Sequence, residues 1–290
     1  MEFISTFING LSLGGVYAMI ALGYTMVYGI AKMLNFAHGD IIMVGGYSLF
    51  VFSADLNVNP YLSVLFAVLI CAAFGMIIEM LAYKPLRGAS PLAVLITAIG
   101  VSYLLQSLAQ IIFGTANKSV KLWELGTLTI GKLSIGWSVI LTLIMAAAVM
   151  VCLTLFVNKT KTGKAMLAVS EDKGAAQIVG VNVNKTISIT FIIGSALAAL
   201  ASVSYILMPV NVSFTMGAMP GIKAFTAAVI GGIGSIPGAM LGGILLGVIE
   251  QFCISTPIGS YTTAIEFAIL IVVLLVKPTG LIGKKKREKV

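Results

Sequence analysis

Nine apolar segments run through the chain, and they limit its possible folds more than any other feature. They fall at about 4–30, 40–54, 61–83, 91–113, 137–157, 187–208, 221–235, 238–254 and 262–276. Lipid offers the backbone no hydrogen-bond partner, so a segment in a membrane must be a helix or part of a closed barrel. Barrel strands alternate over about ten residues, and these segments are longer and evenly apolar. They therefore predict helices.

The composition agrees with this interpretation. Of the 290 residues, 59% are hydrophobic and 10% are charged, whereas a soluble domain is about 25% charged. We predict an all-α integral membrane protein, a polytopic bundle of eight to nine transmembrane helices forming one domain over residues 1–290. The start of the chain lacks the basic region of a cleaved signal peptide and predicts a retained first span.

Basic residues predict the orientation. An external N-terminus leaves only four of the 18 basic residues outside, namely Lys118, Lys121, Lys132 and Lys223, and places the other 14 inside. The positive-inside rule then makes loop 158–186 and the basic tail 277–290 cytoplasmic. The tail also accounts for much of the +8 net charge, so lipid headgroups rather than nucleic acid are its expected contact.

Segments 40–54 and 221–235 are shorter than a span, at about 22 Å each. Each follows a helix-start signal, Gly39-Asp40 or Pro220-Gly221, and we expect Asp40 to cap its helix. Each is the second segment of its half when 137–157 is treated as a linker. This correspondence predicts an inverted repeat, and paired short segments indicate a transport pathway.

Several polar residues lie within the apolar segments. His38 is the only histidine, and either packing or a role as proton relay or ligand explains it. Glu79 is expected to pair near Lys84. Lys223, Glu250 and Glu266 either pair with one another or line the outer mouth of a pathway, because an unpaired charge in a membrane is costly.

The pathway prediction follows from the chemistry of a zwitterionic solute. Helix starts at Asp40 and Gly221 offer positive potential to a carboxylate, with Lys223 reinforcing the second. Asn35, Asp40 or Glu266 offers acceptors to an ammonium group. The predicted pathway residues are Asn35, His38, Gly39, Asp40, Gly221, Lys223, Glu250 and Glu266.

The chain carries no recognisable enzymatic motif. It has no phosphate-binding GxxxxGK[ST] loop and no HExxH spacing, and its three cysteines lie in apolar segments. We therefore predict no catalytic residue, no metal and no directly bound cofactor.

The polar loop 158–186 interrupts the apolar pattern near the middle of the chain. It predicts helices at about 163–170 and 173–180, with Gly163 as a break and Gly180 as a stop. Such short helices are marginal alone, and their apolar residues indicate a protein partner. Glu171, Asp172, Ala175, Ala176 and Gly180 form a pattern that resembles the coupling motif of ABC importer permeases.

Two further stretches resemble the branched-chain amino acid permeases. One is LNFAHGD at 34–40 followed by Gly45-Gly46, and the other is PGIKAF at 220–225 continuing to GGIGSIPGA at 231–239. The resemblance covers essentially the whole chain and is to the first of the two permeases of a leucine, isoleucine and valine importer. Unlike general importer permeases, the chain has no proline shortly after Gly180.

The resemblance implies a bacterial inner-membrane complex. Its partners would be a second related permease, two ATP-binding subunits and a periplasmic substrate-binding protein, with ATP used only by the partners. Two alternatives stay open: an ABC permease for a sugar, urea or amide, or a self-sufficient channel or secondary transporter.

The orientation can be tested by cysteine labelling in intact cells. We expect a membrane-impermeant reagent to modify a cysteine placed at Gly126 and to leave one placed at Thr162 unmodified, because 14 of the 18 basic residues then lie inside. The reverse labelling pattern would overturn the orientation.

Overall fold

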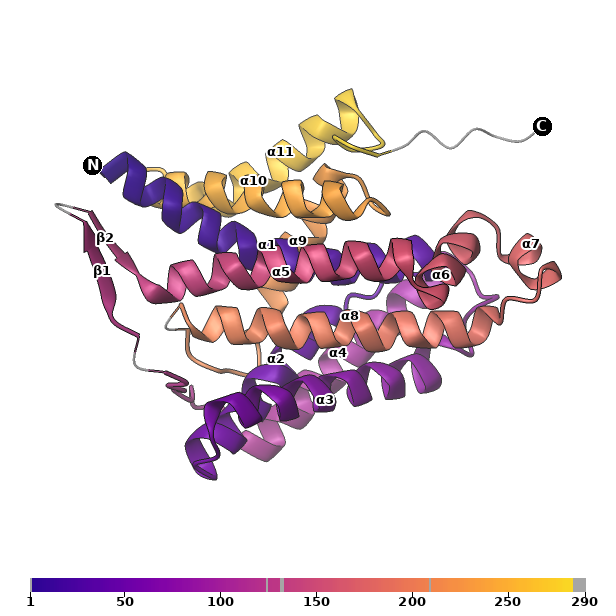
Figure 1. The fold of residues 1–290 in the computed structure, drawn as a ribbon, viewed down its shortest axis with the longest axis horizontal. Coiled ribbons are helices and arrows are strands. Elements are labelled where there is room, and N and C mark those ends of the chain that lie inside the picture. Colours follow the sequence, from indigo (N-terminus) through magenta and orange to yellow (C-terminus); the bar gives the residue numbers. More distant parts are fainter. Residues whose placement is uncertain (1, 124, 131–132, 209, 284–290) are drawn as a thin grey trace.

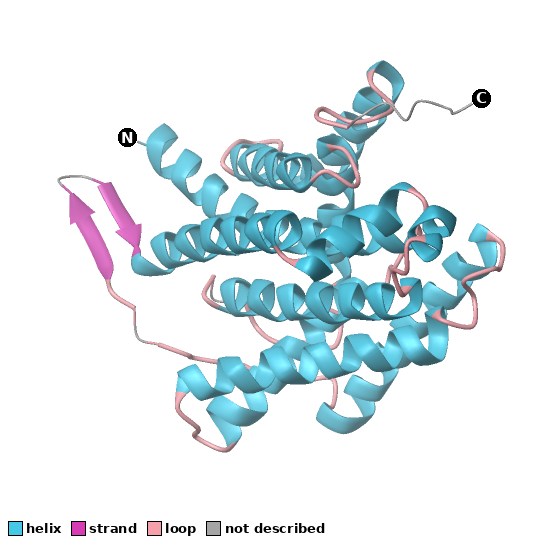
Figure 2. Ribbon diagram, turned by 45° about the vertical axis from the view of Figure 1, so that its right-hand side comes forward, coloured by secondary structure: helices cyan, strands magenta, loops and turns pink. Residues whose placement is uncertain are grey.

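The protein is described by a computed structural model covering residues 2–123, 125–130, 133–208 and 210–283. Figure 1 and Figure 2 show an elongated helical bundle with one small hairpin at one end. Lys132 and the end of the basic tail, 284–290, lie outside the described residues.

Helices make up most of the described chain. They are α1 (Glu2–Ala31), α2 (His38–Leu49), α3 (Pro60–Ile78), α4 (Pro91–Phe113), α5 (Trp137–Lys159), α6 (Lys161–Glu171), α7 (Lys173–Ile178), α8 (Val183–Ile206), α9 (Ala218–Gly231), α10 (Ile236–Ile254) and α11 (Thr262–Val276). The hairpin pairs β1 (Thr127–Ile130) with β2 (Leu133–Gly136) in antiparallel register.

All nine predicted segments are helices, and the predicted fold class is confirmed. Among the described residues, seven helices are long and apolar enough to cross a membrane, and the apolar α9 is shorter. The other short helix, α2, has 12 residues but continues into a π-helical turn, Phe50–Asp55. The segment is therefore longer than the expected 40–54.

Side-chain caps explain where several helices begin. Asn59 accepts a hydrogen bond from the Tyr61 amide before α3, and Ser90 accepts one from Ala93 before α4. Each of these helices opens on proline, which has no amide hydrogen to leave unsatisfied. The sequence therefore fixes these starts locally, before any packing occurs.

The helices form two bundles. In each bundle, the first helix of one half of the chain packs with the later helices of the other half. Bundle A contains α1 with α9, α10 and α11, and bundle B contains α8 with α2, α3 and α4. Figure 1 shows α10 and α11 of bundle A above α8 and α3 of bundle B, with α5 crossing the view between them in front of α1. The contacts follow the predicted inverted repeat, because α1 packs on α10 as α8 packs on α3, and the two bundles meet where α1 contacts α8 and α2 contacts α9.

Glycines allow the equivalent helix pairs to cross closely. A Cβ on Gly247 of α10 would overlap the backbone of Gly14 in α1, and one on Gly75 of α3 would overlap the Ser195 hydroxyl in α8. Small residues are common at membrane helix contacts, where van der Waals packing rather than the hydrophobic effect drives association. These glycines therefore serve the close packing of helices.

The three predicted cytoplasmic loops lie at the same end of the bundle. The Lys173 ammonium group donates a hydrogen bond of 2.9 Å to the Ala31 carbonyl at the end of α1. Arg87, in the loop after α3, bonds to Asn184 at the start of α8. The hairpin lies at the opposite end (Figure 1), as a two-ended transmembrane topology requires.

The α1–α10 crossing yields a stability test. We expect Gly247→Val to destabilise the purified permease by about 3 kcal/mol, the upper range for overpacking, because its Cβ meets backbone that cannot swing away. Gly100→Val in α4 is the matched control, since a Cβ there meets nothing within 4 Å. Thermal unfolding in detergent measures both, and equal midpoints for the two variants would contradict the packing role.

Candidate functional site

The starts of the two short helices meet where the bundles touch. A Cβ on Gly39 would lie 2.5 Å from the Gly217 carbonyl oxygen and 3.2 Å from the Gly221 Cα. Gly39 and Gly221 were both predicted pathway residues, and the structure places them in backbone contact. Neither helix has a side-chain cap at its start. Only glycine permits this approach, because any side chain would separate α2 from α9.

Asp40 is not the helix cap that the sequence suggested. The preceding turn is already closed by a bond from the His38 amide to the Asn35 carbonyl, so α2 begins at His38 and Asp40 lies in its first turn. Its carboxylate instead accepts a 2.8 Å hydrogen bond from Gln106 of α4. This bond joins α2 to the outer helix of its own bundle.

Asn35 and His38 are both buried beside this contact. The Asn35 side-chain carbonyl accepts a 2.8 Å hydrogen bond from the Tyr83 hydroxyl. The His38 ring packs edge-on against Tyr24, with centroids 4.7 Å apart, and Gly23 leaves the space that the ring occupies. These contacts agree with the interpretation of His38 as a packing residue.

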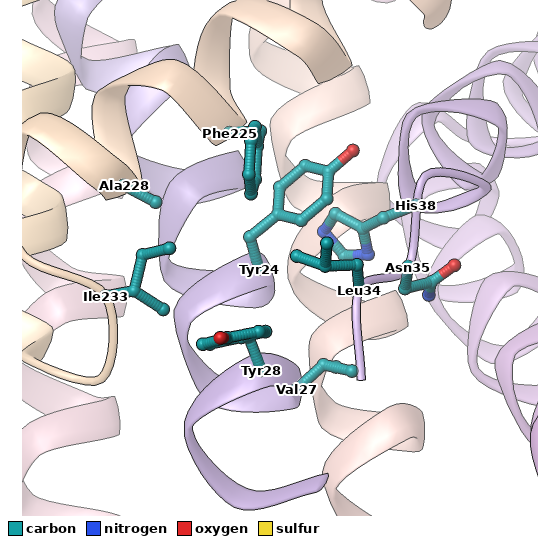
Figure 3. A pocket seen from close by; sticks show the side chains of 9 residues that line it. All are labelled: Tyr24, Val27, Tyr28, Leu34, Asn35, His38, Phe225, Ala228 and Ile233. Atoms are coloured by element: carbon teal, nitrogen blue, oxygen red, sulfur yellow. The ribbon is translucent and has the colours of Figure 1, made fainter. Parts of the chain in front are cut away.

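A small cavity lies where these residues face α1 and α9 (Figure 3). Bundle A supplies Tyr24, Val27, Tyr28, Phe225 and Ala228, joined by Ile233 from the loop after α9, and the connection into α2 supplies Leu34, Asn35 and His38. The cavity measures about 10 Å³, roughly the space that one water molecule needs. In this conformation the seam between the bundles is therefore nearly closed.

Lys223, Glu250 and Glu266 form a buried charge cluster away from that cavity. The Lys223 ammonium nitrogen lies 2.6 Å from a Glu250 oxygen and 3.3 Å from a Glu266 oxygen. The Tyr17 hydroxyl donates a 2.7 Å hydrogen bond to Glu250. Each of the four helices of bundle A contributes one residue, which agrees with the pairing interpretation of the three charges.

Glu79 is paired differently from the prediction. Its side chain is fully buried and contacts Arg87, while the Ser188 hydroxyl donates a 2.7 Å hydrogen bond to it. Lys84 follows in the chain, but only its backbone amide bonds to the Glu79 backbone carbonyl. The partner is Arg87 because the π-helical turn at 79–83 and the loop after it bring the guanidinium back over the carboxylate.

The two helices of the polar loop form as predicted, with one correction. α6 begins at Lys161 under a Thr160 cap, and Gly163 lies inside it, where any side chain would overlap the end of α5. Gly163 is thus a packing position and not a break. Asp172 caps α7 by accepting a 3.0 Å bond from the Ala175 amide, and Glu171 is the last residue of α6.

Gly180 ends the pair as expected. Its φ is +86°, and the Val181 amide bonds to the Ala176 carbonyl at 2.9 Å, which is the Schellman arrangement. Ala176 is buried, whereas Ile178 and Val179 are 88% and 77% exposed. This turn therefore presents an apolar surface at the end of the bundle that holds the predicted cytoplasmic loops.

Lys173 connects this turn to the rest of the protein through its bond to Ala31. Partial burial, and secondarily the nearby Arg87 guanidinium, lower the pKa of Lys173. Tyr24, Val27 and Tyr28 precede Ala31 in α1 and line the cavity. One hydrogen bond therefore joins the polar loop to a helix that forms the cavity wall.

Sequence reasoning missed four polar residues that the structure brings to these sites: Tyr17, Tyr24, Tyr83 and Gln106. All four lie in apolar segments where tyrosine and glutamine are unremarkable alone. Their helical positions relative to Glu250, His38, Asn35 and Asp40 could not be read without the helix contacts.

Comparison with known proteins first defines the class. A structural comparison gives a TM-score of 0.51 with a metal-chelate type ABC transporter solved in an inward-facing conformation, at 18% identity, covering 94% of this chain and 87% of the other. At that identity the similarity concerns the fold alone. The protein thus shares its overall polytopic helical fold with that structure.

Its family is more specific. Residues 6–274 match the family of the branched-chain amino acid transport system permease component, and the chain belongs to it. The chain is 42% identical to the high-affinity branched-chain amino acid transport system permease protein BraD of Pseudomonas aeruginosa and 40% identical to LivH of Escherichia coli, each over 100% of this chain and 98% of the relative. It is a multi-pass membrane protein of the inner membrane, as these permeases and the seven apolar spans indicate.

The charge cluster generates a prediction. We expect Lys223→Met to lower the stability of the purified permease by about 3–5 kcal/mol, because two buried carboxyl groups lose their cation. Adding Glu250→Gln and Glu266→Gln should restore most of the loss. Lys185→Met, at an exposed position, is the control, and thermal unfolding of the four proteins is the measurement. An unchanged midpoint for Lys223→Met would show that the pairs do not hold bundle A together.

Proposed function

We propose that this chain is the membrane-embedded permease subunit of an ATP-driven importer that moves branched-chain amino acids across the bacterial inner membrane. The full-length similarity to permeases described for that transport carries the proposal. We assign ATP hydrolysis to two separate subunits and pair this chain with a second related permease and a periplasmic binding protein.

The proposed pathway follows the seam between bundles A and B. Gly39 and Gly221 bring the starts of α2 and α9 into backbone contact across it, and this contact provides only weak dispersion attraction. Asn35, His38 and Asp40 lie on one side of the seam. Lys223, Glu250 and Glu266 act on the other side by holding α9 within bundle A. Transport then requires the two bundles to separate and close again.

The α6–α7 turn is the proposed contact with an ATPase. Exposed Ile178 and Val179 form its apolar surface, and Glu171, Asp172, Ala175, Ala176 and Gly180 shape the turn. The Lys173 bond to Ala31 gives the turn a direct connection to the cavity wall. A self-sufficient channel or carrier would have no need for such a surface.

The cargo is tested with the assembled complex in proteoliposomes. ATP-dependent uptake of leucine, isoleucine and valine, delivered by the binding protein, is the expected result. Uptake of a sugar, urea or amide in place of these amino acids would support the alternative cargo, and uptake of leucine without ATP or partners would support a self-sufficient carrier.

The ATPase contact gives a separate prediction. We expect Ile178→Glu to reduce ATP-dependent uptake at least tenfold and to weaken co-purification of the ATPase, because a charge replaces an apolar contact. The permease itself should unfold at its normal temperature, since Ile178 is exposed. Ser134→Glu in the hairpin introduces the same charge at the opposite end of the bundle and is the control. Normal co-purification and uptake by Ile178→Glu would contradict the docking role.

A further inference from the structure

Two irregular segments cover the outer side of the contact between α2 and α9. The first is the α8–α9 loop, residues 210–217, which leads from bundle B into the short helix of bundle A. The second is residues 114–123, which lead from α4 toward the hairpin and which we call the strap. The strap lies at the end of the molecule that carries the hairpin (Figure 1), and this is the predicted external end.

The α8–α9 loop lies along α2. A Cβ on Gly46 of α2 would lie 2.7 Å from the Met216 sulfur and 3.3 Å from a methyl carbon of Val212. At the end of the loop, a Cβ on Gly217 would overlap the backbone of Gly39. The loop therefore follows α2 over about two helical turns. For α2 and α9 to separate toward the outside, this loop has to leave α2.

The strap holds the α8–α9 loop in this position. The Lys118 amide donates a 2.8 Å hydrogen bond to the Val212 carbonyl, and the Val212 amide donates one of 2.8 Å to the Lys118 carbonyl. This reciprocal pair is an antiparallel β-bridge. The Lys118 ammonium group also lies 5.5 Å from the centre of the Phe50 ring, in the π-helical turn that continues α2. One strap residue thus joins the loop that enters α9 to the outer end of α2.

Both ends of the strap are fixed to bundle B. The strap begins at Gly114, whose φ of +78° turns the chain out of α4. Phe113, just before this turn, stacks on Tyr47 of α2 with ring centroids 4.2 Å apart. At the other end, the Trp123 ring packs against Tyr61 in the first turn of α3, with centroids 5.5 Å apart. The strap therefore connects the outer ends of three helices of bundle B and attaches the α8–α9 loop to them.

The bridge is the part of this connection that can open without unfolding a helix. Its two hydrogen bonds join backbone groups of irregular segments, and water can replace either partner at small net cost. Beside the bridge, the strap borders a groove of about 360 Å³ whose other wall includes Ile206 and Leu207 at the end of α8. Movement of the strap into this groove would require no displacement of α8.

We propose that the strap is a latch on the external side of the pathway: its bridge to Val212 holds the α8–α9 loop against α2 in the closed protein and breaks when the pathway opens to receive cargo. The latch rests on the proposed function and adds a gating role for Lys118 and Val212. It explains why a loop outside the helical bundle is joined by backbone hydrogen bonds to the segment that enters α9.

The first test fixes the bridge with a disulfide. Paired residues of such a bridge have Cα atoms about 5.5 Å apart, within the range of a disulfide. We expect Lys118→Cys combined with Val212→Cys to crosslink when the closed complex is oxidised. Oxidation should then lower ATP-dependent leucine uptake into proteoliposomes about tenfold or more, because the crosslinked chain cannot leave the closed state, and a reductant should restore uptake. Failure to crosslink, or equal uptake by the oxidised and reduced protein, would overturn the latch.

A matched control places the disulfide in the hairpin. Thr129 and Ser134 are partners in the β1–β2 register, so Thr129→Cys combined with Ser134→Cys adds a crosslink at the same end of the protein without involving the α8–α9 loop. Oxidation of this variant should leave uptake unchanged. An equal loss of uptake would overturn the assignment to the strap. The chain with only its native cysteines, Cys71, Cys152 and Cys253, corrects for other effects of the oxidant.

The second test measures opening by thiol labelling. Val212 is fully buried, so a membrane-impermeant reagent should modify Val212→Cys slowly in the resting complex. During turnover with ATP and cargo-loaded binding protein, labelling should be about tenfold faster, because the thiol reacts only while the bridge is open. Lys121→Cys, at an exposed position of the strap, is the control and should not react faster during turnover. An unchanged rate for Val212→Cys in an actively transporting complex would contradict the latch.

Failure of the latch can be distinguished from failure of the proposed function. If the wild-type complex takes up no branched-chain amino acid, the proposed function is wrong. If it does so, and the Lys118 and Val212 variants behave like their controls, the function stands and the latch is wrong.

Discussion

Backbone contact at glycine is the constraint on which this architecture depends. Two kinds of contact use it: the crossings within each bundle, such as Gly247 on Gly14, and the seam between bundles, where Gly39 meets Gly217 and Gly221. In lipid the hydrophobic effect cannot hold helices together, so close packing has to do so. The crossings within each bundle join long helices over many residues, and between the bundles α1 contacts α8 in the same way, whereas α2 meets α9 near their starts. The same chemistry thus gives extended helix contacts and one short contact between α2 and α9.

Buried polar pairs reinforce that difference. The cluster of Tyr17, Lys223, Glu250 and Glu266 draws one residue from each helix of bundle A, and the Asp40–Gln106 bond joins α2 to α4 within bundle B. Each short helix is therefore tied to its own bundle by a polar contact in its first turns. Removing one partner of a buried pair strongly destabilises a protein, so these contacts oppose movement of the short helices within their own bundles.

The sequence predicted what depends on local pattern and missed what depends on distance in space. Segment lengths, the two short helices, the α6–α7 pair and the Gly180 stop follow from apolar runs and cap residues, and the structure contains them. The cap role of Asp40 was wrong because the turn from Asn35 to His38 starts the helix earlier. The Lys84 partner for Glu79 was wrong because a π-helical turn redirects the chain toward Arg87. The cavity could not be predicted from the sequence, because Tyr24 meets the other lining residues only where α1 crosses α2 and α9.

The position of the Lys173 bond suggests how a distant contact reaches the seam. Ala31 accepts this bond at the end of α1, one turn beyond Val27 and Tyr28 in the cavity wall, and the chain then passes through Leu34 and Asn35 into α2. The connection between the bundles is therefore short, and the polar loop holds it at one point. A displacement of α7 would pull on the segment whose two ends lie in different bundles. The contact of α2 with α9 consists of dispersion contacts at glycine, so such a pull has little to overcome at that point, while the charge cluster keeps α9 with bundle A. A force applied at α7 would therefore reach the segment that enters α2 beside its glycine contact with α9.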